Sequence, residues 1–505
     1  MFPPESFGVG VTVARRGPAP WGDQSSPMAL SSRPLRLGVL LPVDSMSPGQ
    51  KALQLQAVEQ AEAVLAAYKA ELVVGLAADR PATVDRRHGQ VGSASEEWAD
   101  DLLDEDVSEF YADELAMVLN CSRTAATNLW EQATTLRNRL PATWAALADG
   151  ELDWPRARAM AEELGWPARE TPDDVLAGIE RAVLPRATGL SITGLKALVR
   201  KELIKADPAA ADLRKKRAER AADLTARGIG NGMGELRATM PLPEAKEIRA
   251  RADADAWVAK AAGDPRPIGL LRSVALHARV TGAGQDRPTV SAHVEVVAAL
   301  DTLESAAAGA PGMGREPVLV DGEPVTAALA REFLERLDAL CPGGLQAPTD
   351  GTLMLSVVDA DGRLVAAVTR RELESAVRRG RGLCPPPSVD RYEPNPAQRR
   401  FTTSRDRTCR HYGCNNRAGY ADLDHVVAHA DGGETDCTNL CCLCRRHHRL
   451  KTHAPGWRYV MTPGGVLTIT TPSGVTRVSR PPGMTADDRS VLRVSAERDP
   501  DPPPF

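Results

Sequence analysis

Cysteine and histidine are concentrated in one short stretch of this sequence. Six of the nine cysteines lie between Cys409 and Cys444, and six of the nine histidines lie between His411 and His453. The apolar run at residues 37–43 is too short to predict a secretion signal. In a long chain of this kind, close-set Cys and His residues hold a metal more often than they form disulfides. The stretch therefore predicts a metal-binding module.

One set of residues in this stretch has the spacing of a structural zinc site. Cys409 and Cys414 are five residues apart in an expected turn, and Cys444 and His447 are three apart on an expected helix. Two such pairs can converge on one tetrahedral Zn²⁺. Cys441 forms a Cys-x-x-Cys pair with Cys444, so it competes with His447 as the fourth ligand. The sequence leaves that choice open.

A second set of polar residues has the types needed for phosphoryl chemistry: Asp424, His425, Asn439 and His448. The pattern predicts a strand over residues 420–426, in which neighbouring side chains point to opposite faces. It also predicts a helix over 443–451, on which His448 lies about 100° around the axis from His447. The spacing therefore permits two separate sites in one ββα unit.

These residues resemble the HNH endonuclease motif in its zinc-bound ββα-metal form. The resemblance rests on residues 405–409 and 443–451, and on the phrases Asp424-His425-Val426-Val427 and Asp431-Gly432-Gly433. It extends N-terminally, where the helical region resembles a domain of unknown function that precedes HNH motifs in bacterial proteins. The matching phrases there are Leu140-Pro141-Ala142-Thr143, Gly150-Glu151 and Ala157-Arg158-Ala159.

The resemblance implies metal-dependent hydrolysis of DNA phosphodiester bonds, with 5′-phosphate and 3′-hydroxyl products. His425 would be the general base that deprotonates water, a role that suits a near-neutral pKa. Asp424 and His448 would hold a divalent cation, Mg²⁺ or Mn²⁺, with Ni²⁺ or Zn²⁺ as other options. Asn439 would orient His425 or brace the loop. The structural Zn²⁺ would stabilise the fold of the module.

The charge distribution favours a DNA partner locally. The whole chain carries a net charge of -5, which alone argues weakly against nucleic acid. Residues 370–453, however, hold 16 Lys and Arg against 10 Asp and Glu, a net of +6, so the rest carries -11. The expected metal-binding helix supplies four basic residues for phosphate contact, namely Arg445, Arg446, Arg449 and Lys451. The alternative is a solvated basic face.

The chain of 505 residues is too long for one core, so several domains and tails are expected. The fold class is α+β multidomain, with a mostly helical N-terminal domain and a C-terminal ββα-metal module followed by a short β-hairpin region. The expected boundaries are a tail at 1–50, a mainly helical domain at 51–368, a basic, Pro-rich linker at 369–398, an HNH nuclease domain at 399–455, a short β segment at 456–480, and a tail at 481–505.

A helix-turn-helix is expected near residues 113–130. The turn falls at Asn120-Cys121, and Ser122 is placed to cap the second helix. Such a unit can lay its second helix in a DNA major groove, or it can simply be two packed helices of a bundle.

The function expected from the sequence is a cytoplasmic HNH endonuclease that acts on DNA, without a nucleotide cofactor. No run of 18 apolar residues occurs, so no membrane partner is expected. One rival is a zinc-stapled DNA-binding or regulatory protein whose nuclease site is inactive. A second rival is a thiol-based redox sensor that uses Cys437, Cys441 and Cys442.

Overall fold

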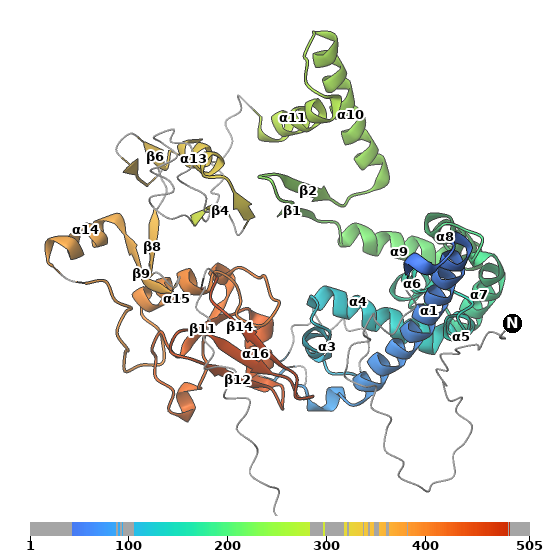
Figure 1. The fold of residues 1–505 in the computed structure, drawn as a ribbon, viewed down its shortest axis with the longest axis horizontal. Coiled ribbons are helices and arrows are strands. Elements are labelled where there is room, and N and C mark those ends of the chain that lie inside the picture. Colours follow the sequence, from blue (N-terminus) through green and yellow to red (C-terminus); the bar gives the residue numbers. More distant parts are fainter. Residues whose placement is uncertain are drawn as a thin grey trace, which may run out of the picture. The chain divides into compact units, whose positions relative to one another are not determined.

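The structure is a computed structural model of the chain (Figure 1). It describes residues 43–86, 89–90, 93, 106–282, 296–297, 318–320, 323–336, 338–341, 344–347, 353–359, 363–380, 382–482 and 484. The chain divides into two units, residues 1–59 and 60–505. In the first unit, a 3₁₀ turn at Val43–Ser45 precedes helix α1 (Pro48–Ala78), so the predicted tail turns helical before residue 50. Residues 1–42 of that tail, and 485–505 of the second one, lie outside the described residues.

The helical domain is built from short helices that begin at strong capping residues. Ser122, Asp153 and Ser191 each accept a hydrogen bond from the third residue of the helix that follows. The helices of this region are α3 (Tyr111–Leu119), α4 (Arg123–Thr134), α5 (Pro141–Ala148), α6 (Trp154–Leu164), α7 (Asp173–Ala187), α8 (Ile192–Ala206) and α9 (Pro208–Arg220). A π-helical turn, Thr135–Arg139, joins α4 to α5.

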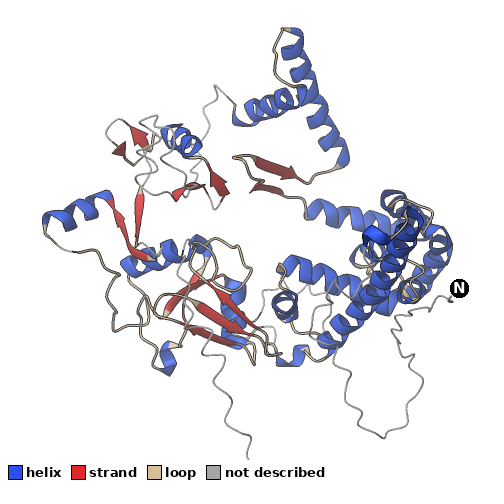
Figure 2. Cartoon of the chain, viewed as in Figure 1, coloured by secondary structure: helices blue, strands red, loops and turns tan. Residues whose placement is uncertain are grey.

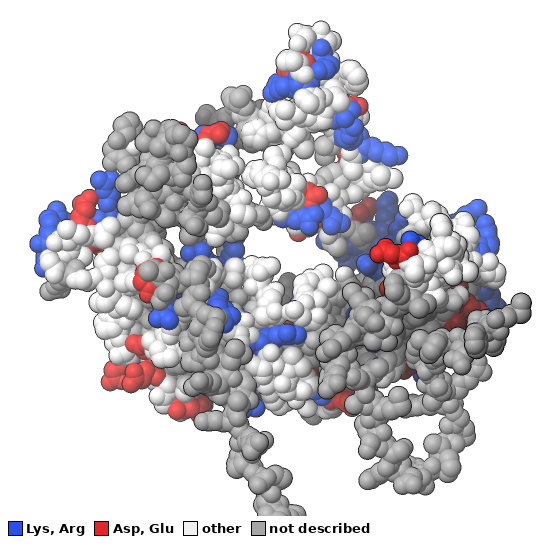
Figure 3. All heavy atoms as spheres, in the orientation of Figure 1, with Lys and Arg blue, Asp and Glu red and all other residues white. Residues whose placement is uncertain are grey.

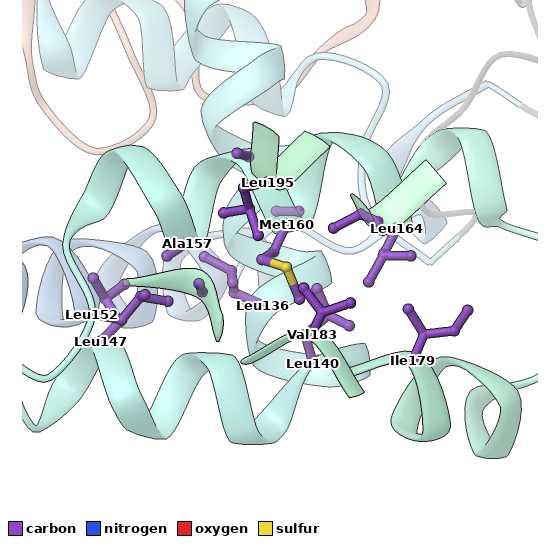
Figure 4. Packing of buried hydrophobic residues seen from close by; sticks show 14 of the residues in the cluster. Leu136, Leu140, Leu147, Leu152, Ala157, Met160, Leu164, Ile179, Val183 and Leu195 are labelled. Carbon is purple, nitrogen blue, oxygen red and sulfur yellow. The ribbon is translucent and has the colours of Figure 1, made fainter. Parts of the chain in front are cut away.

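The core of the helical domain is aliphatic. Leu136, Leu140, Leu147, Met160 and Val183 are fully buried in one cluster. Figure 4 shows side chains from several helices gathering around Met160. This core contains no residue of the Cys/His module, so the two parts have separate hydrophobic centres.

The expected pair of helices near 113–130 is present as α3 and α4. Asn120 ends α3 in the left-handed conformation, with φ of 54°, and Ser122 caps α4 as expected. Most of α3 is buried, and part of what buries it is the Cys/His module, described below. A groove-reading role for α4 stays a prediction.

Strands and further helices follow the helical bundle (Figure 2). A hairpin of β1 (Leu224–Gly228) and β2 (Gly234–Ala238) precedes two helices that pack against one another, α10 (Leu242–Ala261) and α11 (Ile268–Thr281). Further elements are β3 (Val296–Val297), β4 (Val318–Val320), β5 (Glu323–Val325), α13 (Ala327–Arg336), β6 (Leu340–Cys341) and β7 (Gly344–Leu345). The mixture of helix and strand agrees with the expected α+β class.

The segment predicted as a linker at 369–398 begins with regular structure. β8 (Met354–Val358) pairs with β9 (Leu364–Thr369), and a capping box at Thr369 starts α14 (Arg370–Arg378). Val389 then forms an antiparallel bridge with Thr435 of the module. Residues 382–388 carry no helix or strand, so the linker assignment stays a prediction.

The C-terminal module combines two short helices with two small sheets. Helix α15 (Pro396–Asp406) leads to β10 (Asp422–His425), which pairs with β11 (Leu440–Leu443), and α16 (Arg445–His453) follows. A three-stranded antiparallel sheet comes next, with β12 (Arg458–Met461), β13 (Leu467–Thr470) and β14 (Thr476–Ser479), as the turn-rich pattern predicted.

On the face drawn in Figure 3, Lys and Arg occur in several separate groups among uncharged residues. Among the helices of the described ranges, none combines the length and apolar character needed to cross a membrane.

Candidate functional site

Four side chains of the module converge in the geometry of a metal site. The ligand atoms of Cys409, Cys414, Cys444 and His447 all lie within 4.8 Å of one another. His447 Nδ1 is 3.2 Å from Cys444 Sγ and 3.4 Å from Cys409 Sγ. Ligands around a tetrahedral Zn²⁺ are separated by about 3.5–3.8 Å, given its bond lengths to sulfur and nitrogen. The donor set, three sulfurs and one imidazole, therefore fits zinc.

Local structure explains how the four ligands meet. Cys409 and Cys414 lie in the irregular segment after α15, where Gly413 supplies a positive φ of 74° that tightens the turn. Cys444 is the N-cap residue of α16, and His447 lies almost one turn further along that helix. The ligand pairs thus come from a turn and a helix start, as the spacing predicted.

The choice between Cys441 and His447 falls on His447. Cys441 belongs to β11, opposite Asp424 on β10, and is fully buried in the apolar cluster of the module. It is absent from the group of ligand atoms that converge.

The expected catalytic residues lie at the other side of α16 and along β10. Asp424 Oδ1 is 3.5 Å from His448 Nε2, so the two side chains face one another. His448 Nδ1 lies 2.9 Å from Asp422 Oδ2, an acceptor that holds the proton on Nδ1 and turns the Nε2 lone pair toward Asp424. Asp422 was not predicted, although its position two residues before Asp424 on a strand places both on one face.

Asp424 is surrounded by cationic and polar groups. Its Oδ2 is buried and receives no directed hydrogen bond, although the Lys451 ammonium lies 2.9 Å away. The same ammonium donates to the His425 carbonyl at 2.7 Å. Lys451 therefore points into the site as a counter-charge rather than out toward solvent, where a phosphate contact was expected.

His425 is buried and held by a neighbour that the sequence analysis missed. Its Nε2 lies 2.8 Å from Thr435 Oγ1, and the Thr435 hydroxyl donates to the Tyr392 carbonyl at 3.4 Å. Since that hydroxyl has one proton, it accepts from His425 Nε2–H, which leaves Nδ1 unprotonated. Burial lowers the pKa of His425, partly opposed by the Asp424 carboxylate, and this favours the neutral ring.

Tyr392 completes an aromatic group around this histidine. Its ring stacks on His425 with centroids 5.3 Å apart, and its edge meets His429 at 5.6 Å. Tyr392 lies in the segment predicted as a linker, so only the fold brings it to the site. One sequence signal indicates that this region is ordered. Tyr392 comes shortly before a capping box, in which Asn395 and Gln398 start helix α15.

Asn439 braces the loop after β10. Its side chain accepts from Val427 N at 2.9 Å and donates to the carbonyls of Val427 and Glu434 at 3.0 and 2.9 Å. These contacts correspond to the second of the two expected roles, bracing rather than direct orientation of His425.

The four basic residues of α16 have different environments. Arg445 remains exposed and reaches Asp422. Arg446 pairs with Asp113 at 2.7 Å, and Arg449 pairs with Glu109 at 2.5 Å. Both carboxylates come from the helical domain, so in this conformation Arg446 and Arg449 are internal ion-pair partners instead of the phosphate contacts expected from the sequence.

The three cysteines of the redox alternative are buried. Burial raises the pKa of Cys437 to about 11 and raises those of Cys441 and Cys442 further. Thiols in this state are poor nucleophiles at neutral pH, because the thiolate is the reactive form.

Comparison with known proteins places the N-terminal part of the chain in a family. Residues 54–336 match the family described as "Domain of unknown function (DUF222)". The chain is also 32% identical over 224 residues to the uncharacterized protein Rv3776 of Mycobacterium tuberculosis H37Rv. It is 32% identical over 221 residues to the uncharacterized protein Rv2100 of the same strain and to its counterpart MT2160 of strain CDC 1551.

These relatives are matched over part of their length. Each similarity covers 41% of this chain and 39% of the relative. No solved structure matches the chain. The family match ends before Cys409, so it accounts for the helical domain and leaves the Cys/His module to be interpreted from its own geometry. With more than half of its length matched, the chain belongs to the DUF222 family.

Proposed function

We propose that the protein is a metal-dependent HNH-type endonuclease that hydrolyses DNA phosphodiester bonds. The observation that carries the proposal is the meeting of Asp424 and His448 at 3.5 Å, beside His425, on a module that a zinc site would staple. Asp424 is buried with Oδ1 turned toward His448 Nε2, and a carboxylate and an imidazole that face one another can share a cation. Asp424 and His448 would therefore hold Mg²⁺ or Mn²⁺.

His425 would act as the general base. Thr435 holds its Nε2–H, so Nδ1 is the nitrogen that would take a proton from water. The lowered pKa of His425 keeps the ring neutral, and so ready to accept that proton, at physiological pH. When bound, a divalent cation would neutralise charge on the scissile phosphate and on the leaving 3′ oxygen. Asn439 keeps the loop behind His425 in place.

A second candidate function is a zinc-stapled DNA-binding or regulatory protein with an inactive nuclease site. The observation in its favour is the Lys451 ammonium, 2.9 Å from Asp424 Oδ2, which already supplies a positive charge where the cation would bind. Under this alternative the protein binds DNA and leaves it intact.

A plasmid-nicking assay separates the two candidates. With Mg²⁺ or Mn²⁺, we expect the wild-type chain to nick supercoiled DNA, and His425→Ala to reduce the rate by about 100-fold or more. His277→Ala is the matched control, because His277 is an exposed residue of α11. DNA binding without nicking by the wild type would support the second candidate. Nicking that survives His425→Ala would contradict the assigned base.

A further inference from the structure

We propose that Asp113, a residue of the helical domain, is the outer-shell partner of the zinc ligand His447 and couples zinc binding to the docking of α3 on the Cys/His module. Asp113 lies in the first turn of α3, and 334 residues of sequence separate it from His447. The inference is independent of the proposed nuclease activity, because it concerns the structural metal site alone.

The two nitrogens of His447 face two different partners. Nδ1 points to the sulfurs of Cys409 and Cys444, at 3.4 and 3.2 Å. Nε2 lies 3.2 Å from Asp113 Oδ1. A histidine that gives Nδ1 to a metal carries its proton on Nε2, and a carboxylate that accepts this proton fixes the tautomer and makes the ring a better ligand. Asp113 occupies the position of that carboxylate.

The charges around Asp113 suit a zinc site with three thiolates. Such a site has a net charge of about -1, since three thiolates outweigh one divalent ion. Asp113 adds a further negative charge while being only 1% exposed. Arg446 Nη2 lies 2.7 Å from Asp113 Oδ2, and Arg123 Nε lies 3.3 Å from Oδ1. The two guanidinium groups lie where they offset the negative charge of the carboxylate and the thiolates.

Apolar packing surrounds these polar contacts. Phe110 and Met117, from the α3 segment, belong to the same buried cluster as Cys409, Cys444 and Leu450 of the module. The Arg446 guanidinium also donates to the Glu109 carbonyl, and Arg477 Nε donates to the Met117 carbonyl at 3.0 Å. The α3 segment is thus part of the core that encloses the zinc ligands.

Glu109 offers a matched comparison for Asp113. Its carboxylate pairs with Arg449 at 2.5 and 2.9 Å across the same contact between α3 and α16. Within the described part of the chain, the Glu109 carboxylate binds Arg449 and its carbonyl accepts from Arg446, and neither partner is a zinc ligand. Removing its charge weakens the contact between the two parts without touching the His447 ring.

The test measures zinc affinity of the full-length protein by competition with a chromophoric chelator. We expect Asp113→Asn to weaken zinc binding by about 10–100-fold, the usual effect of losing an outer-shell carboxylate. Glu109→Gln should stay within about 2-fold of wild type. Unchanged zinc affinity in Asp113→Asn would overturn the proposal, and so would equal losses in both variants, because Asp113 would then act only through the interface.

A second comparison covers the case in which Asp113→Asn disturbs folding. A cysteine at position 447 would bind zinc through sulfur and would present no N–H to Asp113. We therefore expect Asp113→Asn to lower zinc affinity by less than about 2-fold in a His447→Cys background. The same 10–100-fold loss in that background would show that the effect does not pass through the imidazole, which would also overturn the proposal.

Discussion

At the scale of residues, Thr435 holds one nitrogen of the His425 ring. The hydroxyl passes its own proton to the Tyr392 carbonyl and accepts the proton on His425 Nε2. Thr435→Val keeps the shape but removes the acceptor, so the ring can place its proton on Nδ1 and lose its ability to accept one from water. We expect the nicking rate to fall by about 100-fold, at the lower end of what a general base contributes.

Thr435→Ser is the control for this substitution. It retains the hydroxyl and should stay within a few-fold of the wild-type rate. Equal rates for the Ser and Val variants would contradict the assigned role of the hydroxyl. DNA binding, measured by fluorescence anisotropy without added metal, should be alike in all three proteins, because Thr435 is only 1% exposed and offers DNA no surface.

At the scale of elements, a buried charge network joins α15 to the strands of the module. Asp406, at the end of α15, accepts from the Cys442 backbone N–H at 2.8 Å and pairs with Arg405 and Arg410 at 2.7 and 2.9 Å. Arg405 also donates to the carbonyls of Cys437 and Leu440 at 2.6 and 2.7 Å. Arg410 reaches the Ser479 carbonyl of β14 at 2.7 Å. The network therefore fixes α15 against both sheets.

We predict that Asp406→Asn lowers the free energy of unfolding by about 3–5 kcal/mol, because it leaves two buried guanidinium groups without their anion. Burial alone would raise the pKa of Asp406, but Arg405 and Arg410 outweigh it and hold the pKa below its usual range. A carboxylate with a lowered pKa stabilises the fold above its unfolded pKa of about 3.9, and this contribution is lost as pH falls toward the folded value.

Denaturant unfolding of the wild type and the variant across pH checks this prediction. The difference between them should stay constant from pH 7 to about 5 and shrink below about pH 4. Asp390→Asn, at an exposed aspartate, should stay within about 0.5 kcal/mol of wild type. A difference that grows on acidification would contradict the assigned charge state of Asp406.

The same elements show what the sequence can predict. The convergence of Cys409, Cys414, Cys444 and His447 was predictable because each pair is local, one in a turn and one at the start of a helix. The expected role of Asp424 and His448 in holding a cation was inferred from the resemblance to the HNH motif. Helix α15 was missed although Asn395 and Gln398 form a capping box, because the prolines around them favoured a linker.

Contacts between distant segments could not be predicted in this way. Tyr392 reaches His425 through the bridge between Val389 and Thr435, and no periodicity encodes such a bridge. Likewise, the basic run on α16 has the composition of a DNA-binding surface. Its Arg446 and Arg449 are nevertheless paired with acids more than 300 residues earlier in the chain.

At the scale of the whole molecule, a zinc ion at the Cys/His cluster would link parts of the chain that have separate cores. The cluster that holds Cys409 and Cys444 includes Phe110 and Met117, whereas the cluster around Met160 contains no zinc ligand. Structural zinc binding contributes folding free energy directly, about 10–16 kcal/mol in small zinc modules. Loss of zinc should therefore unfold the module and uncover α3, and should leave the α6–α8 core intact.

Limited proteolysis of the full-length protein, with and without a zinc chelator, checks this last prediction. After chelation we expect new cleavage sites within residues 407–480 and near α3, while residues 152–203 stay protected and most helical circular dichroism is retained. Cys444→Ser should give the same pattern without chelator. Cys384→Ser, at an exposed cysteine outside the ligand cluster, should behave as wild type. Protection of residues 407–480 after complete zinc removal would contradict the role of the metal. Cleavage that spread into residues 152–203 would instead mean that the two cores unfold as one, which their separate packing opposes.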